Sequence, residues 1–277
     1  MARKSKDTGT PKGISEREVR QVEDMATPRT PVIYEVVRRL GDEELNRPAV
    51  SLWWSGVAAG LSISFSLLAQ AVLDLHLPDA PWRPMVSSAG YCVGFLICIL
   101  GRQQLFTEST ITVVLPVLAD FKWATVWQIV QLWVIVLLAN LAGTLFAALF
   151  CYYAPVLAPA LLEQMIAISR GMTELGWWEM AFHGVTSGFL IAAMVWMIPS
   201  AESAKFWVIT LMTYLIALGN FTHIVAGSME AYLLVLAGDW HAGHAVLQFF
   251  VPVLIGNMVG GTALFALISY AQVMEEI

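Results

Sequence analysis

The segment GRQQLFTEST (residues 101–110) interrupts a long apolar stretch that runs from residue 85 to residue 118. A second apolar stretch, residues 204–237, is interrupted in the same way by GNFTHIVAGS (219–228). A membrane-spanning helix needs about 20 apolar residues, and two helices per stretch would need hairpins too short to reach a membrane face. We therefore expect one span per stretch, unwound at mid-membrane, which is tolerated only where the backbone faces protein or a cavity.

Four uninterrupted apolar stretches complete the pattern. They cover residues 51–73, 124–151, 177–198 and 245–271. Composition agrees with a membrane protein, because 58% of the 277 residues are apolar and only 13% are charged, whereas soluble domains carry about a quarter charged residues. The sequence predicts an all-α polytopic membrane protein with six transmembrane segments, of which the second and fifth are broken helices.

The basic residues are concentrated near the N-terminus. Ten of the 15 lysine and arginine residues lie in residues 1–47. Basic residues next to a membrane span mark its cytoplasmic side. We therefore expect a multi-pass protein of the cell (inner) membrane with both termini in the cytoplasm.

The chain divides into four predicted parts. Residues 1–30 are polar and are expected to be disordered. Residues 31–47 place apolar side chains on one helical face, which predicts an amphipathic helix on the membrane or against the bundle, with a solvated helix as the alternative. Residues 48–272 form the predicted transmembrane channel domain, and residues 273–277 form a short cytoplasmic tail.

The two halves of the chain share three short patterns in the same order. LFTE (105–108) in the first break resembles NFTH (220–223) in the second, and an Asn-x-x-Gly pattern recurs at 140–143 and 257–260. A Trp-Trp pair opens both the first and the fourth span. Three spans per half give the halves opposite orientations, and inverted repeats with paired broken helices predict a transport site where the repeats meet.

Three spans also contain the Gly-x-x-x-Gly spacing. These patterns begin at Gly56, Gly184 and Gly256. Small residues at this spacing let two helix backbones approach closely, so we expect tight helix contacts at all three places.

With these residues the chain resembles the formate/nitrite transporter family, and most of all its YfdC-like branch. The resemblance covers residues 31–271 and rests on Leu105-Phe106-Thr107, Phe221-x-His223, Asn140-x-x-Gly143 and Gly256-Asn257-x-x-Gly260. It implies an aquaporin-like protomer, a homopentamer with one pore per subunit, and passage of small monovalent anions or their conjugate acids. Formate, nitrite, hydrosulfide and lactate are the solutes that the resemblance implies.

The resemblance also implies roles for residues along the pore. His223 is the implied central histidine, and Thr107 faces it from the other break. Two apolar constrictions are implied, one formed by Leu105 with Phe95 and the other by Tyr91 with Ile216.

The chemistry of the breaks is compatible with such a pore. Helix N-termini at the two breaks direct partial positive charge at the cavity, which favours an anion. Imidazole titrates near neutrality, so His223 can pass a proton or a hydrogen bond to a weak acid. An ionisable group inside a span is costly and usually functional; the alternative is a histidine whose hydrogen bonds are satisfied by backbone carbonyls.

Two glutamates leave alternatives open. Glu108 either caps the half-helix 109–118, where a carboxylate meets the positive end of the helix dipole, or it faces His223, whose position in the other half it matches. In the second case Glu108 favours imidazolium and cancels its attraction for anions. Glu230 lies seven residues after His223 on nearly the same helix face, and either lines the same pathway or is hydrated near the membrane interface.

We predict a transmembrane channel or transporter for small monovalent anions or their conjugate weak acids, proton-linked through a central histidine, and not an enzyme. The alternatives are a neutral-solute pore retuned by Glu108 and a transport-inactive membrane scaffold or sensor. We expect a small-molecule or ion substrate, the lipid bilayer and further copies of the chain as partners, with no cofactor, metal or nucleic acid. The predicted substrate path comprises His223, Thr107, Glu108, Leu105, Phe106, Phe95, Tyr91, Ile216, Phe221, Asn140, Asn257 and Glu230.

Overall fold

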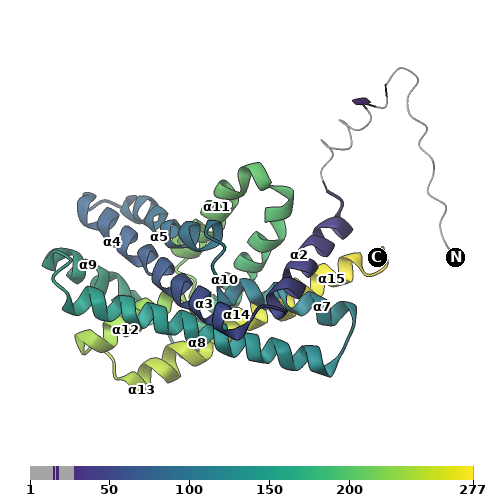
Figure 1. Ribbon diagram of the computed structural model, residues 1–277. Helices are drawn as coiled ribbons and strands as arrows, with labels where there is room; N and C mark the ends of the chain where they lie inside the picture. The colour runs from purple at the N-terminus through teal and green to yellow at the C-terminus, as the bar shows by residue number, and fades with distance from the viewer. Residues whose placement is uncertain (1–14, 16, 19–27, 277) are drawn as a thin grey trace.

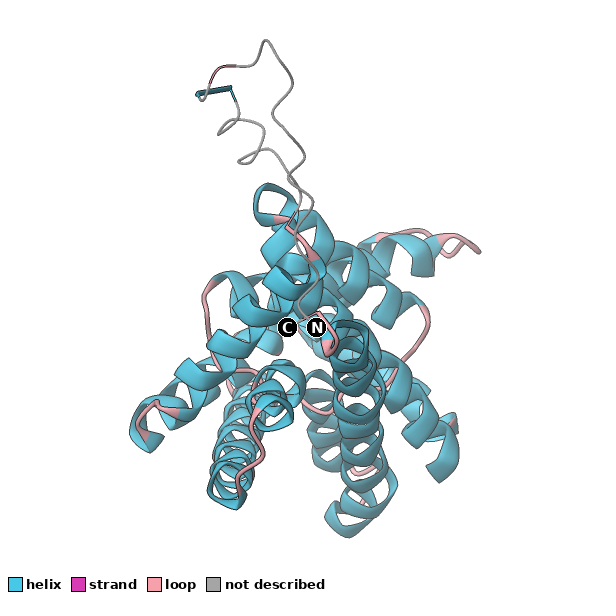
Figure 2. Cartoon of the chain, turned by 90° about the vertical axis from the view of Figure 1, so that its right-hand side faces the viewer, coloured by secondary structure: helices cyan, strands magenta, loops and turns pink. Residues whose placement is uncertain are grey.

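The computed structural model describes residues 15, 17–18 and 28–276, and that part of the chain consists of helices joined by short loops (Figures 1 and 2). The predicted disorder of residues 1–30 therefore falls almost entirely outside the described residues. The all-helical architecture predicted from the apolar stretches is confirmed.

Five helical stretches are long and apolar enough to cross a membrane. They are Ala49–His76, Arg83–Leu100, Trp123–Tyr153, Trp177–Ser200 and Ala242–Val273. The second and third stretches are the single helices α5 and α8, whereas the first consists of α3 (Ala49–Ile63) and α4 (Phe65–His76), and the fourth of α10 (Trp177–Met197) and a short 3-10 turn. The fifth consists of α13 (Ala242–Ala245), α14 (Val251–Met258) and α15 (Leu267–Val273), joined by π-helical turns.

Shorter helices complete the two broken segments. After α5, the chain continues through α6 (Phe106–Thr112) and α7 (Val114–Ala119); the fifth segment is α11 (Lys205–Leu218) followed by α12 (Ala226–Ala237). The prediction of six segments with broken second and fifth members is confirmed.

Glycine contacts hold the long helices together in two matching pairs. Helix α3 packs along α8, and α10 packs along α14. A Cβ atom on Gly60 would lie 2.2 Å from the carbonyl oxygen of Asn140, and one on Gly256 would lie 2.2 Å from that of Ala181. No side chain fits at these crossings, so the close contacts predicted from the Gly-x-x-x-Gly spacings are present.

Both ends of the described chain lie at the same end of the bundle. Helix α2 (Thr30–Leu45) packs against α7 and α15 (Figure 1). The Tyr34 hydroxyl donates to the carbonyl oxygen of Leu115 at 3.4 Å, and Arg29 forms an ion pair with Glu276. This arrangement is the one that six crossings require.

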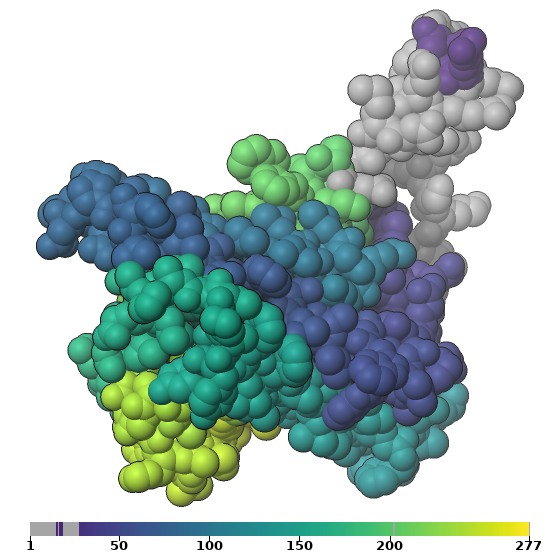
Figure 3. All heavy atoms as spheres, turned by 60° about the vertical axis from the view of Figure 1, so that its left-hand side comes forward, coloured from purple at the N-terminus to yellow at the C-terminus, as the bar shows by residue number. Residues whose placement is uncertain are grey.

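The opposite end of the bundle is covered by the connector between α8 and α10. It contains α9 (Pro159–Arg170) and a 3-10 turn, Gly171–Glu174. Helix α9 packs against α4 and α12 around a small apolar cluster that includes Leu67, Met165 and Met229. Figure 3 shows α8 and α9 between α4 and α5 on one side and α13 on the other.

The outer surface of the bundle is strongly apolar. Large exposed side chains occur on most of the long helices, among them Trp54, Trp127, Phe182, Trp207 and Ile268. A soluble monomer rarely exposes so much contiguous apolar area, whereas a bundle surrounded by lipid or by further subunits does so by necessity.

Candidate functional site: the two helix breaks and the cavity beside them

Both helix breaks begin with the same backbone geometry. Arg102 and Asn220 have φ values of 52° and 51°, in the left-handed region that residues other than glycine rarely adopt. The next residue in each break turns back to the helix that it leaves: Gln103 donates its N–H to Cys98 at 3.0 Å, and the N–H of Phe221 is 2.9 Å from the carbonyl oxygen of Ile216 in the second break.

A buried asparagine holds the first break. The Asn140 Oδ1 atom accepts the N–H of Phe106 at 2.9 Å, and its Nδ2 atom donates to the carbonyl oxygens of Gln104 and Gly56 at 2.9 and 2.8 Å. An unwound backbone at membrane depth leaves polar groups that water does not reach. Asn140 satisfies those groups from α8.

Asn257 holds the second break in the same way from α14. Its Oδ1 atom accepts the N–H of Ile224 at 2.9 Å, and its Nδ2 atom donates to the carbonyl oxygens of Thr222 and Gly184 at 3.2 and 2.9 Å. The two asparagines thus bind equivalent atoms in the two halves. This matched network is the structural form of the repeat that the sequence predicts.

The network corrects one alignment made from the sequence. Phe106 and Ile224 are equivalent, so the counterpart of His223 is Leu105 and not Glu108. The interpretation that Glu108 occupies the position of His223 in the other half is therefore wrong. The similar side chains of LFTE and NFTH suggested an alignment that pairs Glu108 with His223, whereas the backbone hydrogen bonds to the two asparagines pair Leu105 with His223.

Glu108 lies in the first turn of α6. It forms no capping hydrogen bond, and its Oε1 atom is buried without a hydrogen-bond partner. Arg102 pairs with neither Glu108 nor Glu230, since it takes part in no ion pair within the described residues. The position of Glu108 in the first turn of α6 agrees with the alternative in which its carboxylate meets the positive end of the helix dipole, although the side chain does not cap the backbone.

His223 lies at the centre of the second break and is 1% exposed. Its Nε2 atom is 2.8 Å from the hydroxyl oxygen of Thr107, and its Nδ1 atom accepts the N–H of Ala226 at 3.1 Å. Because Nδ1 is an acceptor, the network assigns the ring proton to Nε2, which donates to Thr107. The hydroxyl of Thr107 then keeps its own hydrogen for another acceptor. Backbone carbonyls do not satisfy this imidazole.

Apolar rings surround the His223–Thr107 pair. The ring of Phe95 meets the imidazole edge to face with centroids 5.1 Å apart, and Tyr91 lies against Phe95 at 5.3 Å. Leu105 is fully buried within the same hydrophobic cluster. The pair therefore lies among apolar side chains, where a hydrated ion is excluded.

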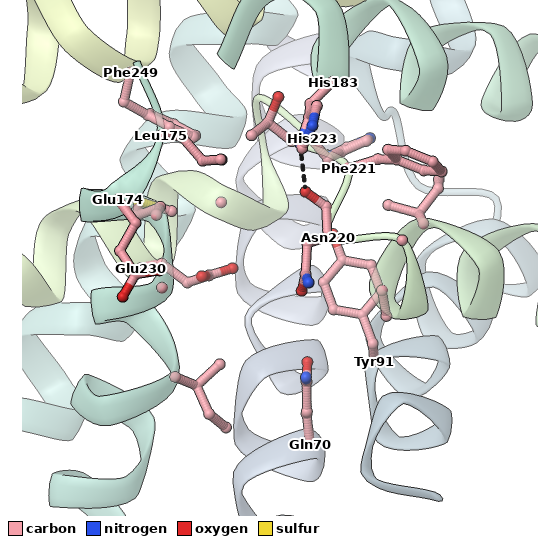
Figure 4. Close-up of a pocket in the computed structure, with 18 residues that line it drawn as sticks. Gln70, Tyr91, Glu174, Leu175, His183, Asn220, Phe221, His223, Glu230 and Phe249 are labelled. Carbon is pink, nitrogen blue, oxygen red and sulfur yellow. Dashed lines mark hydrogen bonds between the residues drawn. The ribbon is translucent and has the colours of Figure 1, made fainter. Parts of the chain in front are cut away.

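A cavity of about 350 Å³ extends from His223 toward the connector, away from the end that holds the termini. Figure 4 shows Tyr91 and Asn220 on one side of it and Glu174 and Glu230 on the other. Five residues of the predicted path line it, namely Tyr91, Ile216, Phe221, His223 and Glu230. Glu230 thus lines this cavity.

The other residues of the predicted path do not line this cavity. Thr107 and Glu108 belong to α6, on the far side of His223. Phe106 packs against Trp133 of α8 with centroids 6.3 Å apart. Asn140 and Asn257 support the breaks through the backbone, as described above.

Several lining residues carry no signal in the sequence. Gln70 comes from α4, Glu174 from the connector, and His183 from α10. The Nδ1 atom of His183 is 3.0 Å from the carbonyl oxygen of Asn220, so this residue links α10 to the second break beside the cavity. Within the described residues, no group of three or more His, Cys, Asp or Glu side chains is placed to hold a metal.

The first break is covered by α2 at the end of the bundle that holds the termini. Thr112 donates to the Glu44 carboxylate at 2.7 Å, and Arg47 donates to the Gln104 side chain at 2.8 Å. Burial raises the pKa of the Glu44 carboxyl to about 7. On the outer face of α2, hydrogen bonds from Arg38 and Arg39 lower the pKa of Glu35 to about 2.

Six spans, two helix breaks held by asparagine side chains and a cavity that ends at the buried His223–Thr107 pair define a membrane transport protein. Comparison with known proteins agrees. A model of the formate/nitrite transporter family matches residues 31–271. The inner membrane protein YfdC of Escherichia coli (strain K12) is 42% identical over 255 residues, which cover 92% of this chain and 82% of YfdC. The chain therefore belongs to the formate/nitrite transporter family.

Two solved structures share the fold. An FNT family ion channel matches with a TM-score of 0.72 over 88% of this chain and 98% of that channel. A pentameric formate channel with formate bound matches with a TM-score of 0.67 over 82% of this chain and 98% of that channel. Each is 21% identical to this chain. Membership of a transporter family confirms the prediction of a transport protein rather than an enzyme.

Proposed function

We propose that this protein conducts small monovalent anions or their conjugate weak acids across the membrane, with formate and nitrite as the first candidates. The observation that carries the proposal is the His223–Thr107 pair, which closes the cavity at the break. Its free hydroxyl hydrogen is a donor for the oxygen of a carboxylic acid or of nitrite. The name of the family and the formate bound to one relative of the same fold point to the same chemistry.

Proton linkage follows from the surroundings of the pair. A bare anion beside Phe95 and Leu105 would lose its hydration without gaining a cation. The same solute carrying its proton is uncharged and crosses this ring at much lower cost. We propose that His223 and Thr107 hydrogen-bond the acid at this point, so that one proton accompanies each anion.

Assembly and orientation belong to the same proposal. One relative of the same fold is a pentamer, and the apolar outer surface offers room for lateral contacts, so we propose a homopentamer with one pore per subunit. The inner membrane location of YfdC and the basic residues before α3 support an inner membrane protein with cytoplasmic termini. The connector between α8 and α10 then faces the outside.

The test is uptake of labelled formate and nitrite into liposomes that hold the purified protein, with His223→Asn as the variant. We expect uptake well above that of protein-free liposomes, reduced about tenfold or more in His223→Asn, since the lost hydrogen bond in a buried site is worth about 1–3 kcal/mol. Acetate and ammonium in the same assay define selectivity. Absence of uptake for every solute would favour the scaffold or sensor alternative.

A further inference from the structure

The charge of the cavity is opposite to the charge expected of an anion entrance. Among the described residues that line it, the carboxyl-bearing residues are Glu230 and Glu174, and none is lysine or arginine. The basic residue of the connector, Arg170, is already paired with Asp239 and Glu163. An anion that enters from this side therefore meets acidic side chains without a compensating cation.

Glu230 is the inner of the two carboxylates. It lies on α12, in the second turn after the helix start at Ala226, and its side chain is partly buried. It has no hydrogen-bond or ion-pair partner in the described part of the chain, so its carboxyl group is available to the cavity. Glu174, in contrast, is exposed at the connector.

Four other titratable groups line the same cavity as Glu230. They are Tyr91 from α5, His183 from α10, Glu174 from the connector and His223 from the break. His223 is held neutral by the N–H that it accepts at Nδ1. The N-terminus of α12 adds a positive contribution equivalent to about half a charge, which is less than the full charge of one carboxylate.

We propose that Glu230 is the residue that selects the charge state of the substrate at this entrance: it bars the ionised form and admits the uncharged acid. In a partly buried cavity two like charges repel more strongly than in bulk water. The uncharged acid meets no such repulsion, and its O–H can donate to the Glu230 carboxylate before it reaches Thr107. This inference rests on the proposed function and specifies the form in which the substrate enters.

The test measures initial formate uptake into liposomes at constant total formate, at several external pH values, with and without an imposed inside-positive potential. Above its pKa, the protonated fraction of a carboxylic acid falls about tenfold per pH unit. We expect uptake by the parent protein to follow that fall and to ignore the potential, which acts on anions alone. In Glu230→Gln, the anion can also enter the cavity and take up its proton from water there, so uptake should depend less steeply on pH. Uptake should still ignore the potential, because the apolar side chains beyond the cavity continue to exclude the anion. Glu230→Asp retains the carboxylate and should behave as the parent does.

The matched control is Glu163→Gln, which makes the same chemical change on α9 outside the cavity and should leave both dependences unchanged. The inference is overturned if Glu230→Gln retains the parent's pH dependence. It is also overturned, whether or not the variant folds, if uptake by the parent itself is driven by the potential. If parent and variant take up formate no faster than protein-free liposomes, the proposed function itself is wrong, which is a separate result.

Discussion

His223 is fixed at both ring nitrogens, and each contact has its own consequence. The bond from Ala226 keeps Nδ1 unprotonated, and the bond to Thr107 leaves the threonine hydroxyl hydrogen free for another acceptor. In the proposed mechanism, the donor offered to a solute is the hydroxyl of Thr107, oriented by the imidazole. Neither residue alone supplies this arrangement.

Replacing Thr107 by valine tests whether its hydroxyl, oriented by His223, is the donor to the solute. The change keeps the side-chain shape but removes the hydroxyl, so the Nε2–H of His223 loses its acceptor and the solute loses its donor. We expect formate uptake in liposomes to fall by about tenfold or more, given about 1–3 kcal/mol for an unpaired buried polar group. Thr210→Val, at a half-buried position on α11 that does not line the cavity, is the control. Unchanged uptake in Thr107→Val would remove the hydroxyl from the mechanism.

The hydrogen bonds of Asn140 and Asn257 to the two helix breaks give a second prediction. Asn257→Leu leaves the N–H of Ile224 without its acceptor, at about 1–3 kcal/mol, and removes one of the two side-chain donors to the carbonyl oxygen of Thr222, which keeps the Ser187 hydroxyl. We expect a clearly lowered midpoint of thermal unfolding in detergent. Asn140→Leu should cause a similar loss, because it breaks the equivalent bonds in the other half. A thermal midpoint equal to that of the parent in either variant would contradict the claim that the asparagine stabilises its helix break.

At the scale of the elements, the crossing of α3 and α8 depends on glycine. A methyl group at Gly60 would lie 2.2 Å from a backbone oxygen, which cannot move as a flexible side chain can. Gly60→Ala should therefore separate the two helices and yield aggregated or thermally unstable protein. Gly243→Ala, where a Cβ atom would meet nothing within 4 Å, is the matched control. Size-exclusion chromatography and thermal unfolding distinguish the two, and equal stability would refute close packing at Gly60.

The docking of α2 should depend on pH through Glu44. Its pKa is about 7 in the docked helix against an ordinary value of 4.5, because burial penalises the charged form; Thr112, Gln104 and Arg47 offset that penalty only in part. The docked state binds the proton more tightly, so its stability is complete at low pH and declines as pH rises from about 4.5 through 7. Amide hydrogen exchange of residues 30–45 should show protection lost over this range.

Glu44→Gln should keep that protection at both ends of the range, while Glu43→Gln, at the exposed neighbouring position, should titrate as the parent does. Comparing the variants at equal pH cancels the intrinsic pH dependence of exchange. Protection of α2 that is the same in the parent and in Glu44→Gln at pH 8 would contradict the role of Glu44.

At the scale of the whole molecule, hydropathy was sufficient to predict the spans. The stretch predicted at residues 51–73 is the helix Ala49–His76, and the stretch predicted at residues 204–237 is α11 with α12. Such patterns are readable because a bilayer requires long apolar helices and tolerates few exceptions.

The site was only partly predictable. The central histidine and its threonine partner stand in the two breaks, which the sequence marks by polar residues within apolar stretches. Short side-chain motifs did not determine the register of the repeat, because equivalence in the two halves is set by which backbone groups the asparagines bind. The cavity lining from Gln70 and Glu174 was not predicted, since those segments meet only after the helices have packed.

The internal pH of dye-loaded liposomes, followed after an inward formate gradient is imposed, shows whether a proton crosses with formate. Conduction of a weak acid through the His223–Thr107 site delivers a proton with each formate. We therefore predict rapid internal acidification that requires the protein and is lost in His223→Asn. Acidification no faster than in protein-free liposomes, or equally fast in His223→Asn, would contradict the account.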